Sequence, residues 1–444
     1  MAFAILTNVS TGGIAFGPLE PTVAADQDVA FYTAAMIARF SLDAGQTWSA
    51  ANIVSGANLF PQDLDGGFVQ ADQNAAWFEN ADRFVWTMLT LPDGNGQNRI
   101  RIAVTSKSVL VNSKAKGWLV MDITSAQLGF RSQWFDYPQI AVGDEFLTIT
   151  ANIAPKGAGR GSGGPVGTVI IFIRLTEFDS LQGHTVNFNF FAEMFKANGG
   201  INGYTAAKYG GSTVTWAMHV AGTAQQAILR VYQWDSGKNS VTWQDVKIPA
   251  WSNSGYSSLT PDGMDWLNGL DGRITGAVEI RSTEWVFAWT AAADRNFPHP
   301  YIYLAHVGRN FAKVIQLLGH REIWSKRIAW AFPALAAPDV PMRNPSLAMS
   351  CGWGGEKVEF AHHSVGFVEM PFTSTSIYDN QTSVKSAAGG QPWGDFLSVS
   401  RYKHPPDKGL VLHPARGMYA ATGTVISKDA AGVVRWNPQF VIFE

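Results

Sequence analysis

The chain has 444 residues, of which 46% are hydrophobic and only 15% charged, so it can bury a large core and is not intrinsically disordered. The formal net charge is −2 and no run of lysines and arginines stands out, which argues against a nucleic-acid partner. The longest apolar runs, such as VIIFI at 169–173, are far too short to span a membrane.

Short runs in which apolar and polar residues alternate follow one another along the chain, bounded by Gly, Asp, Asn and Pro. In chain order the clearest are TVAADQDVAFYTA, RFVWTMLTL, RIRIAVTS, EFLTITAN, AILRVYQW, WVFAWTAA, YIYLAHV and QFVIFE. Alternation with a period of two, bounded by turn residues, predicts antiparallel strands. SLQGHTVNFNFFAEMF (180–195) and FAKVIQLLGH (311–320) are ambiguous, and we favour strand for both.

One unit recurs along the chain: a small or polar start, an apolar strand, a turn and a second, more aromatic strand. The units begin near Glu20, Ala71, Asp136, Asn202, Asp271, Arg343 and Trp393. A spacing of roughly 50–70 residues is typical of β-propeller blades with loop insertions. One four-stranded sheet cannot bury both of its faces, whereas a ring of about seven sheets can.

We therefore predict an all-β fold, a single β-propeller domain over residues 1–444 with seven four-stranded blades. Six blades, or a pair of β-sandwiches, are the alternatives. A strand from AFAILT or QFVIFE, at the two ends of the sequence, is expected to close the ring.

The segment SLDAGQTW at 41–48 predicts a tight hairpin turn. Asp43 can accept backbone N–H groups across the turn, Gly45 can take a positive φ, Ser41 and Thr47 can bond locally, and Trp48 can pack beneath. Every defined position of this segment resembles the Asp-box, or BNR repeat, of sialidase-like propellers. The resemblance implies a structural hairpin between two outer strands of a blade, away from the active face.

The resemblance covers most of the chain. GGFVQADQNAAWFENADRFVWTMLT, WFDYPQIAVGDEFLTITAN, RNPSLAMSCGWGG and PWGDFLSVS are similar to segments of exported microbial propellers of this superfamily, which have no single assigned activity. The resemblance implies a secreted carbohydrate-directed hydrolase as one candidate. A true sialidase needs three arginines, a Tyr–Glu pair and an acidic Asp, and this full set cannot be assembled here.

Candidate site residues lie where the chain enters the innermost strand of each blade, because those strands line the central channel. The catalytic candidates are Glu20, Asp72, Asp136, Tyr137 and Asp395. The substrate-binding candidates are Gln73, Arg273, Arg343, Asn344, Trp134, Trp266 and Trp393. Crowded carboxylates raise one another's pKa or hold Ca²⁺, arginines clamp carboxylates, and tryptophan rings stack on sugars. The alternative is that these groups only hydrogen-bond the channel wall.

The sequence thus favours a channel site for a polar or glycan-like small molecule, used by a hydrolase or lyase. The other hypotheses are a non-catalytic carbohydrate-binding or scaffold propeller, and a cyclase or isomerase with an aromatic pocket. The sequence indicates no particular cofactor, and a Ca²⁺ ion in the channel is one hypothesis. Localisation stays open between a secreted protein whose signal peptide was removed and a cytoplasmic one, since the first residues lack a basic and apolar leader.

Overall fold

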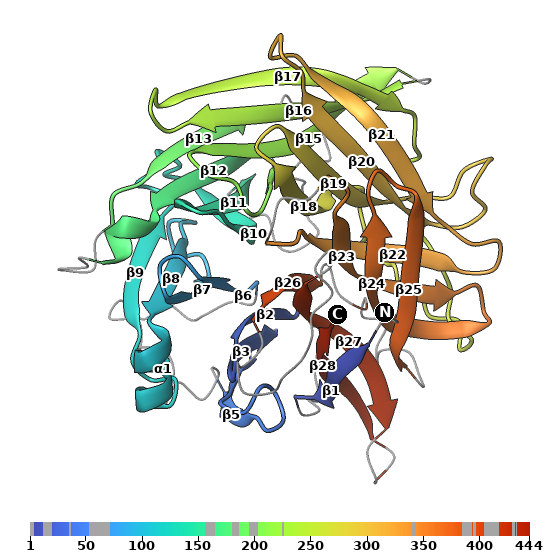
Figure 1. Cartoon of the computed structure of the whole chain (residues 1–444), viewed down its shortest axis with the longest axis horizontal. Helices are drawn as coiled ribbons and strands as arrows, with labels where there is room; N and C mark the ends of the chain where they lie inside the picture. Colours follow the sequence, from blue (N-terminus) through green and yellow to red (C-terminus); the bar gives the residue numbers. More distant parts are fainter. Residues whose placement is uncertain are drawn as a thin grey trace.

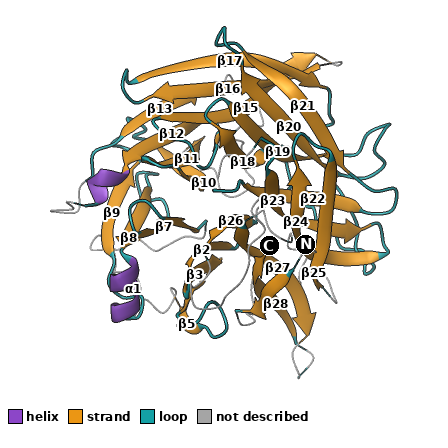
Figure 2. Ribbon diagram, viewed as in Figure 1, coloured by secondary structure: helices purple, strands orange, loops and turns teal. Residues whose placement is uncertain are grey.

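The structure is a computed structural model. It describes residues 4–11, 20–34, 37–52, 72–155, 165–179, 186–194, 203–223, 226–339, 343–383, 393, 397–403, 417–428, 431 and 433–444. In this part of the chain seven four-stranded antiparallel sheets stand around a common axis (Figure 1). The predicted seven-bladed β-propeller is confirmed, and the six-bladed and sandwich alternatives are excluded. Figure 2 shows how little of the described chain is helical.

The first four blades contain the following strands, each named from the innermost outward. Blade 1 has β2 (Thr22–Asp26), β3 (Val29–Ala34), β4 (Ile37–Ser41) and β5 (Ser49–Asn52). Blade 2 has β6 (Asn74–Phe78), β7 (Arg83–Leu89), β8 (Arg99–Thr105) and β9 (Leu119–Thr124). Blade 3 has β10 (Gln133–Val142), β11 (Phe146–Pro155), β12 (Gly167–Arg174) and β13 (Asn189–Met194). Blade 4 has β14 (Thr205–Ala206), β15 (Thr213–Thr223), β16 (Gln226–Asp235) and β17 (Ser240–Pro249).

The remaining blades complete the ring. Blade 5 has β18 (Ile274–Arg281), β19 (Glu284–Ala291), β20 (Tyr301–Arg309) and β21 (Ile315–Ile323). Blade 6 has β22 (Ala329–Ala336), β23 (Ser346–Gly355), β24 (Glu359–Glu369) and β25 (Ser374–Thr382). Blade 7 has β26 (Ser398–Tyr402), β27 (Met418–Lys428), β28 (Val434–Phe443) and, outermost, β1 (Ile5–Ser10). A short helix α1 (Lys107–Ser113) and a 3₁₀ turn η1 (Leu175–Phe178) follow β8 and β12.

Both ends of the chain close the ring. β28 is the third strand of blade 7, and β1 pairs with it antiparallel, with Asn8 opposite Val441. The main chains of Ala4 and Glu444 exchange two hydrogen bonds, of 3.2 and 3.1 Å. The first and last blades are thereby joined through one sheet, as the sequence predicted for its two terminal segments.

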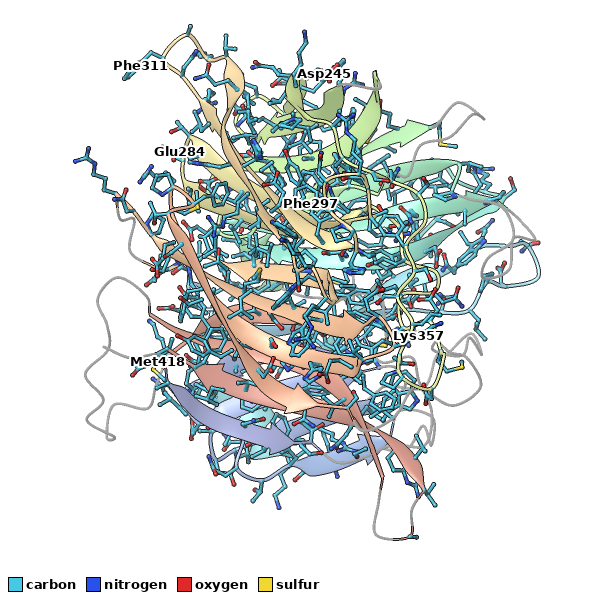
Figure 3. The ribbon with its side chains drawn as sticks, turned by 90° about the vertical axis from the view of Figure 1, so that its right-hand side faces the viewer. Asp245, Glu284, Phe297, Phe311, Lys357 and Met418 are labelled. Atoms are coloured by element: carbon cyan, nitrogen blue, oxygen red, sulfur yellow. The ribbon has the colours of Figure 1, made fainter. Side chains whose placement is uncertain are left out.

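The ring has two faces, and the chain enters every innermost strand from the same one. We call this the upper face, and we call the opposite face, which carries the turns between first and second strands, the lower face. In the side view of Figure 3, Glu284, Phe311 and Met418 lie toward the lower face and Lys357 toward the upper face. Phe311, in the turn between β20 and β21, is fully exposed.

Aromatic side chains fill the space between blades. Phe172 of blade 3 stacks on Trp234 of blade 4 with ring centroids 4.2 Å apart. Such flat, bulky side chains suit strands that are buried on both faces, since each sheet packs on the next one. The two ambiguous segments provide the outer strands β13 and β21, so the preference for strand was correct.

Hydrogen bonds between neighbouring innermost strands join the blades around the channel. They are made by side chains at the upper ends of these strands. Two of these side chains accept from the main chain: Ser398 Oγ from Val23 N, and Thr22 Oγ1 from Ala75 N. Three donate to carbonyls: Asn74 Nδ2 to Pro138, Thr205 Oγ1 to Ile274, and Thr275 Oγ1 to Pro333. These side chains therefore serve to hold the blades together.

The sixth blade begins earlier than the sequence predicted. Its innermost strand is β22, from Ala329, and not a strand starting near Arg343. Phe332 in β22 has a φ of 58° and precedes a proline, and the strand register shifts there. Because of this interruption, apolar and polar residues do not alternate along β22, and the sequence shows no clear strand signal there. The RNPSLAMSCGWGG segment instead provides β23, the second strand of the blade.

Candidate functional site

A cavity of about 210 Å³ occupies the central channel. Innermost strands of blades 1 to 5 and 7 line it, together with Asp339 from the connection after β22. At its lower rim stand the exposed residues Glu79, Asn80, Asp144 and Lys403. The cavity is thus a real meeting point of distant segments, as the propeller predicted, and its rim lies on the lower face.

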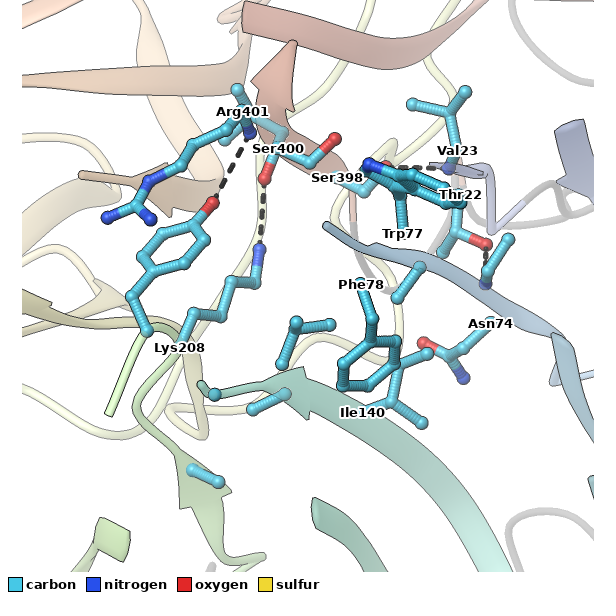
Figure 4. A pocket seen from close by; sticks show the side chains of 18 of the residues that line it. Thr22, Val23, Asn74, Trp77, Phe78, Ile140, Lys208, Ser398, Ser400 and Arg401 are labelled. Carbon is cyan, nitrogen blue, oxygen red and sulfur yellow. Dashed lines mark hydrogen bonds between the residues drawn. The ribbon is translucent and has the colours of Figure 1, made fainter. Parts of the chain in front are cut away.

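A connection from blade 4 crosses the channel. After β14, the main chain at 207–211 bonds to blade 3 through Tyr209 N and Val142 O, and to blade 5 through Lys208 N and Ala277 O. Lys208 then extends its side chain to blades 6 and 7, where Nζ donates to the carbonyls of Leu335 (3.3 Å) and Val399 (3.0 Å) (Figure 4). Burial lowers the pKa of the Lys208 amine to about 8.

Arg401 of β26 fixes the crossing segment to blade 7. Its guanidinium lies 3.7 Å from the ring centroid of Tyr209, and it forms a 3.1 Å ion pair with Asp339. It also donates to the carbonyls of Ala337 and Pro338. Because the guanidinium already has these partners, Arg401 acts as a rigid wall of the cavity.

Two carboxyl groups near the lower rim bind protons more strongly than usual. Burial raises the pKa of Asp144, and the nearby carboxylates of Asp339 and Glu145 add to the shift, against Arg401. Burial raises the pKa of Glu279 to about 7, although Trp285 Nε1 donates to its Oε2 at 2.9 Å. A carboxyl with such a pKa can hold a proton near neutral pH, as a general acid must.

A tryptophan and a serine in the cavity wall each have a buried polar atom that makes no hydrogen bond among the described residues. Trp77 packs on Phe84, with ring centroids 4.5 Å apart, and lines the cavity (Figure 4). Trp77 Nε1 and Ser400 Oγ are buried and have no hydrogen-bond partner among the described residues. A buried polar group without a partner costs free energy, so both atoms favour a polar occupant.

The predicted site residues divide into separate groups. Tyr137 of blade 3 and Arg273 of blade 5 meet at the upper mouth, with the guanidinium 3.8 Å from the tyrosine ring centroid. Asp271 binds Arg273 through two oxygens, at 2.6 and 2.8 Å. Although burial opposes it, the charge of Arg273 holds the pKa of Asp271 below its usual range. Among the described residues, the predicted residues Tyr137 and Arg273 are therefore in direct contact at the upper mouth.

Four of the other carboxylate and amide candidates are buried or half-buried side chains. Glu20 and Asp72 are buried, at 3% and 4% exposure, and Asp136 is half-buried on β10. Gln73, 1% exposed, accepts from Trp86 Nε1 and donates to the carbonyl of Ile37, so it bridges strands and is not open to a substrate. Asp395 lies outside the described residues.

The three tryptophans expected to bind a sugar are buried side chains. Trp134 is 5% exposed and donates to the carbonyl of Pro155. Trp266 and Trp393 pack against each other and on Phe332, at 4% and 2% exposure. The prediction of a stacking platform is therefore wrong at these positions, because a buried ring offers no free face.

Arg343 and Asn344 lie far from the upper mouth, because they follow β22 instead of preceding an innermost strand. They line a second cavity, of about 460 Å³, between blades 5 and 6 on the lower side. Arg281, Glu284 and His306 form its polar wall, with Arg281 and His306 both bound to Glu284. A joint clamp of Arg343 and Arg273 on one carboxylate is excluded by this arrangement.

A metal centre gains no support from the described part of the chain, in which no three His, Cys, Asp or Glu side chains are grouped to hold an ion. Cys351 is buried, and burial raises the pKa of its thiol, as expected for an inert cysteine. None of the described helices is long and apolar enough to cross a membrane.

Comparison with known proteins finds structural similarity at low sequence identity only. No family model and no curated protein sequence matches the chain. Among solved structures, the sialidase of Trypanosoma rangeli is 12% identical with a TM-score of 0.38 over 96% of this chain and 70% of that one. The NanB sialidase of Streptococcus pneumoniae is 10% identical, with a TM-score of 0.35 over 98% and 68%.

A mutant apocarotenoid oxygenase of Synechocystis is also similar. It is 8% identical, with a TM-score of 0.40, over 81% of this chain and 70% of that one. These identities and TM-scores are too low to carry an argument about the activity of this chain. Function has to be argued from the site.

Proposed function

We propose that the protein binds a small polar, glycan-like molecule in the channel cavity. The observation that carries this proposal is the pair of unpartnered polar atoms, Trp77 Nε1 and Ser400 Oγ, in the wall of that cavity. A hydroxyl-rich ligand would give both atoms the hydrogen bonds they lack.

The composition of the cavity wall favours a sugar over an apolar ligand. Trp77 offers an aromatic ring, while Asn80 and Asp144 offer an amide and a carboxylate at the rim, 3.4 Å from each other. Aromatic rings that pack on the apolar face of a sugar, combined with amides and carboxylates for its hydroxyls, form a suitable site. A cyclase pocket with few charges fits this wall less well.

The hydrolase or lyase form of the proposal is supported by the two carboxyl groups with raised pKa, Asp144 and Glu279. A protonated and an ionised carboxyl near one ligand provide an acid and a base. Asp144 lines the cavity, whereas Glu279 lies behind the crossing segment, 3.4 Å from the position of a Cβ on Gly210. Asp144 is therefore the group closer to a ligand.

A binding experiment tests the proposal. Saturation-transfer NMR on a panel of mono- and disaccharides should identify a ligand, and Trp77→Ala should weaken its binding by about tenfold, as lost stacking and a lost hydrogen bond imply. Trp243→Ala is the matched control, since Trp243 is 53% exposed on the outer strand β17. Equal affinity in wild type and Trp77→Ala, with both folded by circular dichroism, would refute the channel site.

Turnover separates an enzyme from a binding protein. In an enzyme, Asp144→Asn should lower the rate of hydrolysis or elimination of the identified ligand about 100-fold or more, because an acid or base is removed. Ligand binding without any turnover by the wild-type protein would instead support the non-catalytic carbohydrate-binding propeller.

A further inference from the structure

The amine of Lys208 has an unusual set of partners for a lysine inside a protein. Its Nζ donates to two backbone carbonyls, those of Leu335 and Val399. In the part of the chain that the structure describes, no carboxylate forms an ion pair with it. Buried lysines ordinarily have a negative partner, so this site is not built to hold a permanent positive charge.

The number of hydrogen bonds points to the neutral form of the amine. An ammonium has three protons to donate, whereas a neutral amine has two protons and one lone pair. The two carbonyl acceptors match the two protons of the neutral amine. The lone pair is then left without a proton, on an atom whose side chain lines the channel cavity. Burial lowers the pKa of Lys208 to about 8, so more of its amine is neutral near pH 7 than in an ordinary lysine.

Four charged residues lie on the segments that pack around Lys208, and none of the four forms an ion pair with its amine. Arg401 lies on β26, Asp339 after β22, Asp144 between β10 and β11, and Glu279 on β18. Arg401 and Asp339 neutralise each other through their 3.1 Å ion pair. Burial raises the pKa of Asp144, and it raises that of Glu279 to about 7, so Glu279 carries less than a full negative charge near neutral pH.

A second observation concerns a hydroxyl group in the cavity wall next to this amine's contact on blade 7. Ser400, directly after the carbonyl of Val399 that Lys208 contacts, lines the same cavity, and its Oγ is buried without a partner among the described residues. Figure 4 shows Lys208 and Ser400 on the same side of the cavity. A hydroxyl in that place can donate to a carbonyl oxygen that the amine attacks.

We propose that Lys208 is a nucleophile that condenses with a small aldehyde, such as the open-chain form of a reducing sugar, held in the channel cavity. This inference rests on the proposed function and names the ligand's reactive group. The Nζ lone pair forms the bond to the carbonyl carbon, and the carbonyl π electrons move to oxygen, which takes up a proton. That proton comes from the amine, and loss of the oxygen as water together with the second amine proton leaves a C=N bond, so no oxidant, reductant or cofactor is needed.

Reductive trapping on the full chain tests this chemistry. The protein is incubated at pH 7 with glycolaldehyde and sodium cyanoborohydride, and labelled lysines are quantified by peptide mass mapping. Lys208 should be labelled at least about tenfold faster than the exposed Lys238, because burial increases the share of the Lys208 amine that is neutral at that pH. The labelling rate of Lys208 should rise with pH and level off above about pH 8.

Variants and a parallel measurement make the result decisive. Lys208→Met should abolish this fast label, and Lys238→Met, its matched control on an exposed turn, should leave it unchanged. Slow labelling of Lys208, equal to that of Lys238, overturns the inference. Saturation-transfer NMR of a non-reducing methyl glycoside is run alongside: binding without a Lys208 adduct overturns the inference alone, and absence of both overturns the proposed function as well.

Discussion

Single residues set how the stability of this protein depends on pH. His219 lies between Trp251 and Trp289, with ring centroids 4.7 and 4.6 Å away, and neither ring nitrogen has a hydrogen-bond partner among the described residues. Burial lowers the pKa of His219 to about 3, and does the same for His363. In the unfolded chain these histidines have a pKa of about 6.5. Between about pH 6.5 and about pH 3 they therefore bind protons in the unfolded chain but not in the folded one. The free energy of unfolding falls as the pH is lowered through this window.

Replacing His219 tests this linkage. His219→Phe removes two buried nitrogens and one titrating group while keeping an aromatic ring between the tryptophans. The difference in thermal unfolding midpoint between pH 7 and pH 4.5 should become smaller than in the wild type. His320→Phe, at a position that is 38% exposed, is the control and should leave that difference unchanged. An unchanged difference in His219→Phe would contradict the prediction.

Residue-scale reasoning also explains why the cavity wall could not be predicted from the sequence. The sequences around Lys208 and Arg401 show ordinary strand patterns. The two residues lie near each other only because the propeller ring brings blades 4 and 7 together. The residues expected to form the site lie at the upper ends of the innermost strands, whereas Lys208 and Arg401 lie near the lower ends. A basic residue next to a tyrosine in both Lys208-Tyr209 and Arg401-Tyr402 was the one local signal available.

At the scale of single elements, the turn between β4 and β5 agrees closely with its sequence. Asp43 accepts from Thr47 N at 2.8 Å and from Ser41 Oγ at 2.7 Å, and Trp48 Nε1 donates to the carbonyl of Gly45. Gly45 has a φ of 83°, as the turn requires. These contacts are local, which is why residue types and spacing alone could predict them.

The same turn also has a long-range role that the sequence does not reveal. A Cβ on Gly45 would lie 2.3 Å from Cε1 of Phe440, in β28 of blade 7. Gly45→Ala should therefore destabilise the fold by about 1–3 kcal/mol through overpacking, in addition to the strain of a positive φ. Asp43→Ala should cost about 1–2 kcal/mol through lost hydrogen bonds.

Urea unfolding monitored by tryptophan fluorescence measures both changes. Gly129→Ala separates the two effects of the Gly45 substitution, because Gly129 also has a positive φ, of 89°, but has no atom within 4 Å of an added Cβ. If Gly45→Ala is no more destabilising than Gly129→Ala, the contact with Phe440 does not constrain the turn.

The whole molecule depends on a sheet built from both ends of the chain. Without β1, the edge of β28 would be exposed over the span from Gln439 to Phe443. An unpaired strand edge promotes association with other chains. The alternating pattern of the terminal segments predicted this closure, whereas the start of blade 6 was missed because Phe332 and Pro333 interrupt the pattern of β22.

Deleting residues 1–11 should therefore lower the thermal midpoint and produce aggregates on size-exclusion chromatography, with the other blades keeping their strand signal in circular dichroism. Adding a synthetic peptide with the sequence of residues 1–11 should restore the monomer-like elution of the deleted chain, since the peptide can pair with β28. A deleted chain that stays as stable and as well dispersed as the full chain would show that blade 7 does not need its fourth strand.

The two hydrogen bonds between Ala4 and Glu444 hold the two ends of the chain side by side. A few glycines and serines would suffice to link these ends, and the polypeptide could then be cut open elsewhere. The tip around Phe311, which projects into solvent between β20 and β21, is a suitable place for new termini. Such a circular permutant would begin within blade 5 and would carry any fused probe on the same face as the cavity rim.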